Sequence, residues 1–294
     1  MIEMKIDKIR LVYYSGTGGT RMVADNFAKQ LRDQGFQVTV QRLKAGEPEA
    51  QGDFDLLLVV FAVYALNAPE PVYTWIKKLP ARQGKSAVVI SVSGGGEMSP
   101  NTACRHKAIK MLEAKGYRVW YEQMLVMPSN IAIATKSPLD KLLLTVLPHK
   151  IALIIDEMNR GVIRRTKPHL FDRALAAMGG MERIGAHQFG KRIKVLESCN
   201  SCGLCADSCP SGNIIMVNGR PSFGTKCFFC MNCLYCCPSK ALRPGIGKFA
   251  MLKTGFDMEA LACSPSTEIL SAKQLKALAP GLAWSGVRKY INED

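Results

Sequence analysis

Two matched runs of cysteine lie in the last third of the chain and constrain its fold more than any other feature. Eight of the eleven cysteines take the spacing Cys-x2-Cys-x2-Cys-x3-Cys-Pro, four in each run. The first run is Cys199, Cys202, Cys205 and Cys209, and the second is Cys227, Cys230, Cys233 and Cys237. Two residues between successive cysteines let a tight turn direct three thiols at one point, while the fourth lies further along. One repeat used twice predicts a small domain with pseudo-twofold symmetry.

This spacing resembles that of bacterial ferredoxins, in which the fourth cysteine of each run binds the cluster of the other run. Two [4Fe–4S] clusters with crossed ligands are therefore expected. One would be held by Cys199, Cys202, Cys205 and Cys237, and the other by Cys227, Cys230, Cys233 and Cys209. The second run also contains Cys236, which could replace Cys237. Its shorter spacing and the proline that follows Cys237 favour Cys237 as the ligand.

Zinc sites and disulfides are the alternative interpretations of these cysteines. A structural zinc site usually takes its four ligands from two separated pairs, and three evenly spaced cysteines per run fit that pattern badly. Disulfides are typical of exported proteins, whereas charged residues interrupt the apolar ones over residues 1–9, so that no signal-peptide layout is visible there. Thiolates and oxygen-sensitive clusters suit a reducing compartment. A cytoplasmic iron–sulfur protein is the expectation.

A loop rich in glycine and hydroxyl groups near the N-terminus predicts a phosphate site. Residues 9–14 are apolar, β-branched or aromatic, as in a buried strand, and Val23, Phe27 and Leu31 then form the apolar stripe of a helix. The loop between these two elements is Ser15-Gly16-Thr17-Gly18-Gly19-Thr20. Converging backbone N–H groups and the dipole of a helix N-terminus bind phosphate. A structural turn without a ligand is the alternative.

The pattern Ser-x-Thr-Gly-x-Thr in this loop resembles the FMN phosphate loop of flavodoxins. No lysine closes the loop, so it is not the loop of a nucleoside triphosphatase. Arg21 stands where the dinucleotide fingerprint has its third glycine, which also disfavours that motif. A phosphate monoester held without a compensating cation is characteristic of flavodoxins.

Alternating strands and helices over the first 130 residues predict a doubly wound α/β fold with a parallel sheet. Further strands are expected at 38–40, 55–64, 86–93 and 118–126. Helices are expected at 69–79 and 102–116. Ligands of such sheets bind at the carboxyl ends of the strands. The resemblance to flavodoxins implies the strand order 2-1-3-4-5 and three FMN-binding loops at that edge, over residues 15–20, 64–69 and 93–100.

The FMN contacts that this resemblance implies come from all three loops. They are Ser15, Gly16, Thr17, Gly18, Gly19, Thr20, Tyr64, Ala65, Leu66, Asn67, Ser93, Gly94, Gly95 and Gly96. Flavodoxin loops usually supply aromatic residues on both sides of the ring, but here Tyr64 is the only one. One face of the flavin is therefore expected to be open. Trp75 is expected in the core, and only Tyr64 and Glu97 are candidates for acid–base chemistry, with no residue assigned as catalytic.

The chain carries a net charge of +15, and the excess of basic residues lies before residue 251. Solubility and neutralisation of anionic clusters would explain it. Attraction of an acidic redox partner, such as a ferredoxin, is the functional interpretation. No nucleic-acid motif with interleaved aromatic residues is present. Charged residues and Pro148 interrupt the most apolar stretch, 139–158, so it is not expected to span a membrane. It is expected to pack across the sheet or between domains, with a membrane-surface helix as the alternative.

The whole chain resembles the flavodoxin–ferredoxin fusion proteins of anaerobic bacteria and archaea. The expected division is an FMN domain over 1–135, a helical connection over 136–189, a small α+β two-cluster domain over 190–250, and a C-terminal extension over 251–294 that packs on the rest. The resemblance implies electron transfer between two [4Fe–4S] clusters and FMN, as a carrier or adaptor between a low-potential donor such as ferredoxin and a partner oxidoreductase. An FMN-dependent reductase with its own small substrate at the open flavin face is the alternative.

Overall fold

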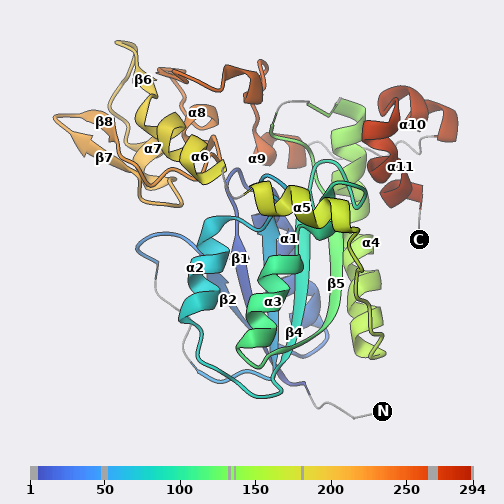
Figure 1. Ribbon diagram of the computed structural model, residues 1–294. Coiled ribbons are helices and arrows are strands. Elements are labelled where there is room, and N and C mark those ends of the chain that lie inside the picture. The colour runs from blue at the N-terminus through green and yellow to red at the C-terminus, as the bar shows by residue number, and fades with distance from the viewer. Residues whose placement is uncertain are drawn as a thin grey trace.

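The computed structural model describes residues 6–47, 52–131, 134–135, 137–179, 182–263 and 271–292. Figure 1 shows a twisted sheet flanked by helices, with the cysteine-rich segment and the C-terminal helices gathered towards the same end of that sheet. The fold thus brings the cysteine-rich segment and the C-terminal helices, which follow each other in the sequence, to one end of a sheet formed by the first 126 residues.

Five strands form a single parallel sheet. They are β1 (Lys8–Tyr14), β2 (Gln37–Arg42), β3 (Leu56–Ala62), β4 (Ser86–Ser93) and β5 (Arg118–Val126). Their order is β2-β1-β3-β4-β5, and each neighbouring pair is parallel. The central strands β3 and β4 are buried almost throughout, because crossover helices cover both faces of a parallel sheet. The predicted flavodoxin-like sheet, with its order 2-1-3-4-5, is confirmed.

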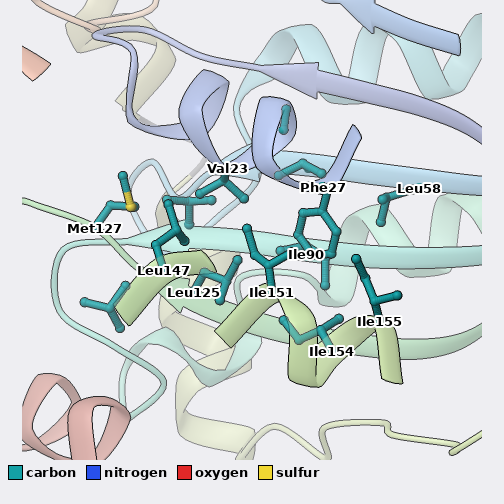
Figure 2. Close-up of a cluster of buried hydrophobic side chains, with 14 of the residues drawn as sticks. Val23, Phe27, Leu58, Ile90, Leu125, Met127, Leu147, Ile151, Ile154 and Ile155 are labelled. Atoms are coloured by element: carbon teal, nitrogen blue, oxygen red, sulfur yellow. The ribbon is translucent and has the colours of Figure 1, made fainter. Parts of the chain in front are cut away.

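Helices cover the two faces of the sheet. α1 (Gly19–Asp33) and α4 (Ser137–Asn159) pack on one face, and α2 (Glu70–Lys78) and α3 (His106–Ala114) pack on the other. Figure 2 shows the first face, where Phe27 of α1 and Ile151 of α4 meet Ile90 of the sheet. Trp75 of α2 lies in the core of the second face, as predicted.

Helix α4 contains the most apolar stretch of the chain. Leu143, Leu147 and Ile151 recur every four positions and are buried against the sheet, and Pro148 lies within the helix. The apolar residues of α4 are therefore part of the core of the flavodoxin-like sheet, as the packing interpretation predicted. None of the helices in the described ranges is both long enough and apolar enough to cross a membrane.

The cysteine-rich segment follows two short helices, α5 (Leu170–Met178) and α6 (Glu182–Lys191). It is built from β6 (Lys194–Val195), α7 (Leu204–Asp207), β7 (Ile214–Val217), β8 (Arg220–Phe223), α8 (Asn232–Tyr235) and β9 (Leu242–Arg243). Strand β6 pairs with β9 and β7 pairs with β8, both antiparallel. Its apolar core is small and includes cysteines together with Phe189, Ile214 and Leu242.

The C-terminal segment returns to the sheet. Its elements are a short turn of helix η3 (Lys248–Ala250), α9 (Met258–Ala262), α10 (Ala272–Leu278), η4 (Leu282–Trp284) and α11 (Ser285–Asn292). Met258, Leu275 and Val287 are buried in the core that α1 and α4 form on the sheet. The segment therefore packs on the flavodoxin-like part, and its first residues also contact the cysteine-rich one, where Ala250 joins the small core and Leu252 N–H donates to Tyr235 Oη at 3.0 Å.

Candidate functional site

The loop over residues 15–20 joins β1 to the N-terminus of α1. Gly18 has a left-handed backbone (φ 100°) at the N-cap, and its N–H donates a hydrogen bond to Ser15 Oγ at 3.2 Å. Asn130, which follows β5, donates from Nδ2 to Thr17 Oγ1 at 2.7 Å. Because the first N–H groups of α1 have no partner within the helix, this loop has the geometry of an anion site.

The three predicted loops meet around one cavity of about 370 Å³, which lies in the usual size range of cofactor pockets. Its lining includes most of the predicted FMN contacts: Ser15, Gly16, Thr17, Gly19, Thr20, Tyr64, Ala65, Leu66, Ser93, Gly94 and Gly95. Gly18 lines a neighbouring cavity on the other side of the loop, and Asn67 lines a third one next to Tyr64. Gly96 instead lies against the backbone of Gly286.

Two groups of cavity residues were not predicted from the sequence. The first, residues 127–131, follows β5, and its position at the carboxyl edge of the sheet could have indicated it. The second comes from the C-terminal segment and consists of Phe256, Met258 and Trp284. No sequence pattern indicated these three residues, because their position at the cavity depends on how the C-terminal segment packs on the sheet.

Glu97 is not available for acid–base chemistry in this cavity. Its carboxylate pairs with Arg105, whose side chain is fully buried, and it accepts a hydrogen bond from Thr166 Oγ1 at 2.9 Å. Arg105 also bridges to Glu122, with 2.7 Å between Nε and Oε2. Glu97 therefore belongs to a structural ion network beneath the third loop, while Tyr64 lines the cavity.

The two cysteine runs share backbone features at an offset of 28 positions, which relates Cys199 to Cys227, for example. Ser201 and Phe229 both have positive φ, as do Gly203 and Met231. A one-turn helix follows in each run, α7 and then α8. The left-handed residues make the tight turns between successive cysteines. The predicted duplication is thus present in the conformation as well as in the letters.

The N–H groups directed at the fourth cysteines follow the same repeat. Asn213 N–H donates to Cys209 Sγ at 3.3 Å, and Ala241 N–H donates to Cys237 Sγ at 3.2 Å. Although burial opposes it, hydrogen bonds from Ser239 and the backbone lower the pKa of the Cys237 thiol. Such N–H···S bonds stabilise a thiolate and are a means of tuning iron–sulfur clusters.

One set of thiols, which we call the outer set, surrounds a small pocket. The outer set is Cys199, Cys202, Cys205 and Cys237, and all four line that pocket. Cys202 is exposed, and Leu204 and Met216, which line the same pocket, are 47% and 36% exposed. The outer set therefore lies next to the surface of the molecule.

The other set, which we call the inner set, is Cys209, Cys227, Cys230 and Cys233. These thiols lie within electrostatic range of one another. Burial raises the pKa of Cys227 to about 11 and that of Cys230 to about 12. Buried thiols of this kind become thiolates only beside a compensating positive charge, such as a bound metal.

Cys236 occupies the position that Ser208 has in the first run. The two side chains face each other across the repeat, with 3.3 Å between Ser208 Oγ and Cys236 Sγ. Burial raises the pKa of Cys236, whereas that of Cys237 is lowered. Cys237 is the equivalent of Cys209, and this equivalence favours it over Cys236 as a ligand.

Within the described residues, no three or more His, Cys, Asp or Glu side chains are arranged to hold a metal ion together. The four thiolates of a cubane each bind a different iron, so they lie farther apart than the ligands of one ion. The cysteine sets fit that chemistry in number, spacing and N–H donors.

The inner set contacts the loop over residues 15–20. A Cβ atom added to Gly16 would lie 2.7 Å from Cys230 Cβ, so only glycine fits there. Behind this contact, the ring centroids of Tyr14 and Phe228 are 6.3 Å apart. Burial first, and then the neighbouring Tyr64 and Cys230, raise the pKa of Tyr14. Gly16, which lines the cavity of about 370 Å³ on one side, thus meets the inner set on the other.

Comparison with known proteins finds a similarity for one of these parts. Residues 11–127 match the model of the flavodoxin family. No curated protein sequence matches the chain significantly. Flavodoxins bind FMN and transfer electrons, and the match covers less than half of this chain.

Solved flavodoxins are similar in structure to parts of the chain. One from the domain Archaea has 15% identity and a TM-score of 0.35, and covers 51% of this chain and 99% of its own. Oxidised flavodoxin 2 from Bacillus cereus has 14% identity and a TM-score of 0.38, with the same two coverages. A flavodoxin from Streptococcus pneumoniae has 18% identity and a TM-score of 0.33, and covers 50% of this chain and 99% of its own.

Proposed function

We propose that this chain binds FMN and two [4Fe–4S] clusters and transfers electrons between them, as a carrier or adaptor between a low-potential donor such as a ferredoxin and a partner oxidoreductase. The observation that carries the proposal is the contact between Gly16 of the phosphate loop and Cys230 of the inner set. Iron–sulfur clusters exchange single electrons, and FMN accepts one or two. Holding both groups in one polypeptide replaces a bimolecular encounter by an internal step.

The residues around the cavity are suited to FMN. The loop from Ser15 to Thr20 offers N–H and hydroxyl groups to the phosphate at the start of α1. Asn130 holds the Thr17 hydroxyl in place through its 2.7 Å hydrogen bond. The second and third loops supply the remaining walls, where Gly94 and Gly95 allow close approach of the backbone.

The outer set is suited to exchange with a partner protein. Exposed Leu204 and Met216 beside it form an apolar border, and Ile215 and Val217 of the same strand as Met216 are 62% and 47% exposed. Apolar surface of this kind, on a chain with a net charge of +15, favours an acidic redox protein that docks there. Electrons would then pass between that partner, the outer set, the inner set and the flavin.

Anaerobic purification of the full chain, with an absorbance spectrum and assays of iron and flavin, tests this function. About eight irons and one FMN per chain are expected. Zinc in place of iron, or about four irons, would overturn the two-cluster assignment, and absence of flavin would overturn the FMN assignment.

The phosphate loop can be tested on its own. Changing Thr17→Val and Thr20→Val together should lower the FMN content, because two hydroxyl groups that face the cavity are lost. Thr74→Val is the matched control, because Thr74 is exposed on α2. Equal flavin content in all three proteins would contradict the assigned loop.

A second candidate function is an FMN-dependent reductase with its own small substrate. The observation that favours it is a cavity of about 250 Å³ beside Tyr64, bordered by His106, Lys107, Arg173 and His187. These side chains would suit an anionic substrate with an apolar body. Steady consumption of such a compound by the reduced protein, lost in Arg173→Ala, would favour the reductase over the carrier.

A further inference from the structure

The C-terminal segment contributes side chains to the cavity of about 370 Å³ that the three predicted FMN loops surround. Phe256, Met258 and Trp284 all line it, although they lie more than 100 residues beyond the flavodoxin match at 11–127. Met258 lies at the phosphate end, because its side chain would contact Cβ atoms placed on Gly18 and Gly19, at 3.4 and 3.3 Å. Trp284 directly precedes α11, whose Gly286 lies against Gly95 and Gly96 of the third loop.

Helix α11, which begins directly after Trp284, is fixed to the third loop by backbone contact. A Cβ atom on Gly96 would lie 2.5 Å from the carbonyl carbon of Gly286, and one on Gly286 would lie 2.6 Å from Gly95 O. Both positions therefore need glycine. Val287, one residue further, is fully buried in the core, which anchors the helix.

The turn before Trp284 is held as well. Ser285 Oγ donates a hydrogen bond to Leu282 O at 2.7 Å and lies 3.1 Å from Met98 Sδ. Arg288 Nη1 donates to Gly281 O at 2.8 Å. The backbone on both sides of Trp284 is thus fixed to the third loop or to the C-terminal segment itself, and the Trp284 side chain lines the cavity.

The predicted FMN loops supply few aromatic side chains that could contact a flavin ring. Tyr64 is the only aromatic residue in the second loop, and the third loop has none. We propose that Trp284 contacts the isoalloxazine ring of bound FMN on the face that these loops leave uncovered, so that the C-terminal segment closes the flavin site. This inference rests on the proposed binding of FMN. An indole suits the role because flat aromatic groups stack favourably in partly buried sites.

The test uses the full chain purified anaerobically, with the flavin removed and then titrated back. Trp284→Leu should weaken FMN binding by about threefold to tenfold, the range expected for loss of one aromatic stacking contact. It should also raise the fluorescence of the bound flavin, because a contacting indole quenches it. Trp284→Phe should restore most of the affinity but less of the quenching.

Two controls make the outcome decisive. Leu282→Ala changes the same short helix at a side chain that is 84% exposed, and it should leave affinity and fluorescence unchanged. Gly286→Val should move α11 off the third loop and raise the flavin fluorescence with Trp284 still present. Wild-type affinity and quenching in Trp284→Leu would overturn the inference while leaving FMN binding intact. A wild-type chain that binds no FMN would instead overturn the proposed function.

Discussion

The sheet and the cysteine-rich segment of this chain are stabilised in different ways. The sheet buries apolar residues on both faces, from Val23 and Phe27 on one side to Trp75 on the other. The cysteine-rich segment has two short two-stranded sheets and a small core to which its own cysteines belong. The sheet therefore has what it needs to fold before any cofactor binds. The cysteine-rich segment is expected to depend on the clusters proposed for it, because below a certain size a core alone does not stabilise a domain.

The largest effect is expected from removal of iron. Treatment of the anaerobic protein with a chelator should abolish protection from hydrogen exchange over residues 199–243, because metal binding and folding are coupled there. Peptides from β3 and β4 should keep their protection, since their burial does not involve the cysteines. Hydrogen exchange followed by mass spectrometry measures both regions in one sample. Persistent protection of the cysteine-rich peptides after complete loss of iron would contradict the expectation that this segment, unlike the sheet, needs metal to fold.

A large effect within the sheet is expected at Arg105. Changing Arg105→Met should lower the free energy of unfolding by about 3–5 kcal/mol, because Glu122, only 4% exposed, loses its 2.7 Å ion pair and keeps the longer one to Arg165, at 3.2 Å. Urea unfolding followed by far-ultraviolet circular dichroism gives this value. Arg160→Met removes an ion pair whose partners are 61% and 62% exposed, and should cost less than about 1 kcal/mol. Equal losses in the two variants would show that the network adds nothing to the sheet.

A smaller, pH-dependent effect is expected at Asp140 of α4. Its side chain is 8% exposed, and burial raises its pKa to about 7. The folded chain therefore holds this proton more tightly than the unfolded one. The resulting stabilisation is complete below the unfolded pKa of about 3.9 and is lost as the pH rises through 7.

Asp140→Asn removes that dependence, because the amide stays neutral. The variant should gain about 1–2 kcal/mol over the wild type at pH 8 and much less at pH 5. Thermal and urea unfolding at both pH values measure the difference. Asp156→Asn, exposed on the same helix, is the control and should change stability by less than about 0.5 kcal/mol. A gain that is the same at pH 5 and pH 8 would contradict the raised pKa.

The smallest effect is expected at Cys236. Cys236→Ser places in the second run the residue that Ser208 provides in the first, and should leave the iron content unchanged. Cys237→Ser should instead lose about four irons, because one cluster would lack a ligand. Iron assays and electron paramagnetic resonance of the reduced proteins distinguish the two. Loss of iron in Cys236→Ser with none in Cys237→Ser would reverse the ligand assignment.

The sequence was informative where chemistry depends on neighbours in the chain. The apolar runs predicted the five strands, and the loop from Ser15 to Thr20 lies between a strand and a helix as expected. The cysteine spacing predicted two crossed ligand sets, which stay a prediction, and the four thiols of the outer set line one pocket. For the strands and the loop the signal is local, because strand length and turn geometry are set within a few residues.

Contacts between distant parts of the chain were not predictable. Asn130 reaches Thr17 across 113 positions, and Trp284 reaches the cavity only because Gly286 meets Gly96. Glu97 was predicted as a candidate for acid–base chemistry, but in the structure its carboxylate pairs with buried Arg105. A glycine or a glutamate in isolation carries no information about such partners, which only the folded chain brings together.

The repeat of 28 positions gives the two cysteine runs matching turns, so that within the cysteine-rich segment the two copies are equivalent. Docking removes that equivalence. Because Gly16 meets Cys230, and not its counterpart Cys202, one copy faces the sheet and the other faces solvent. The two copies thereby come to lie in different surroundings, one at the sheet and one at the surface, although their cysteine spacing is the same. Such a chain could change its outward partner through the residues around one copy while the other copy stays fixed.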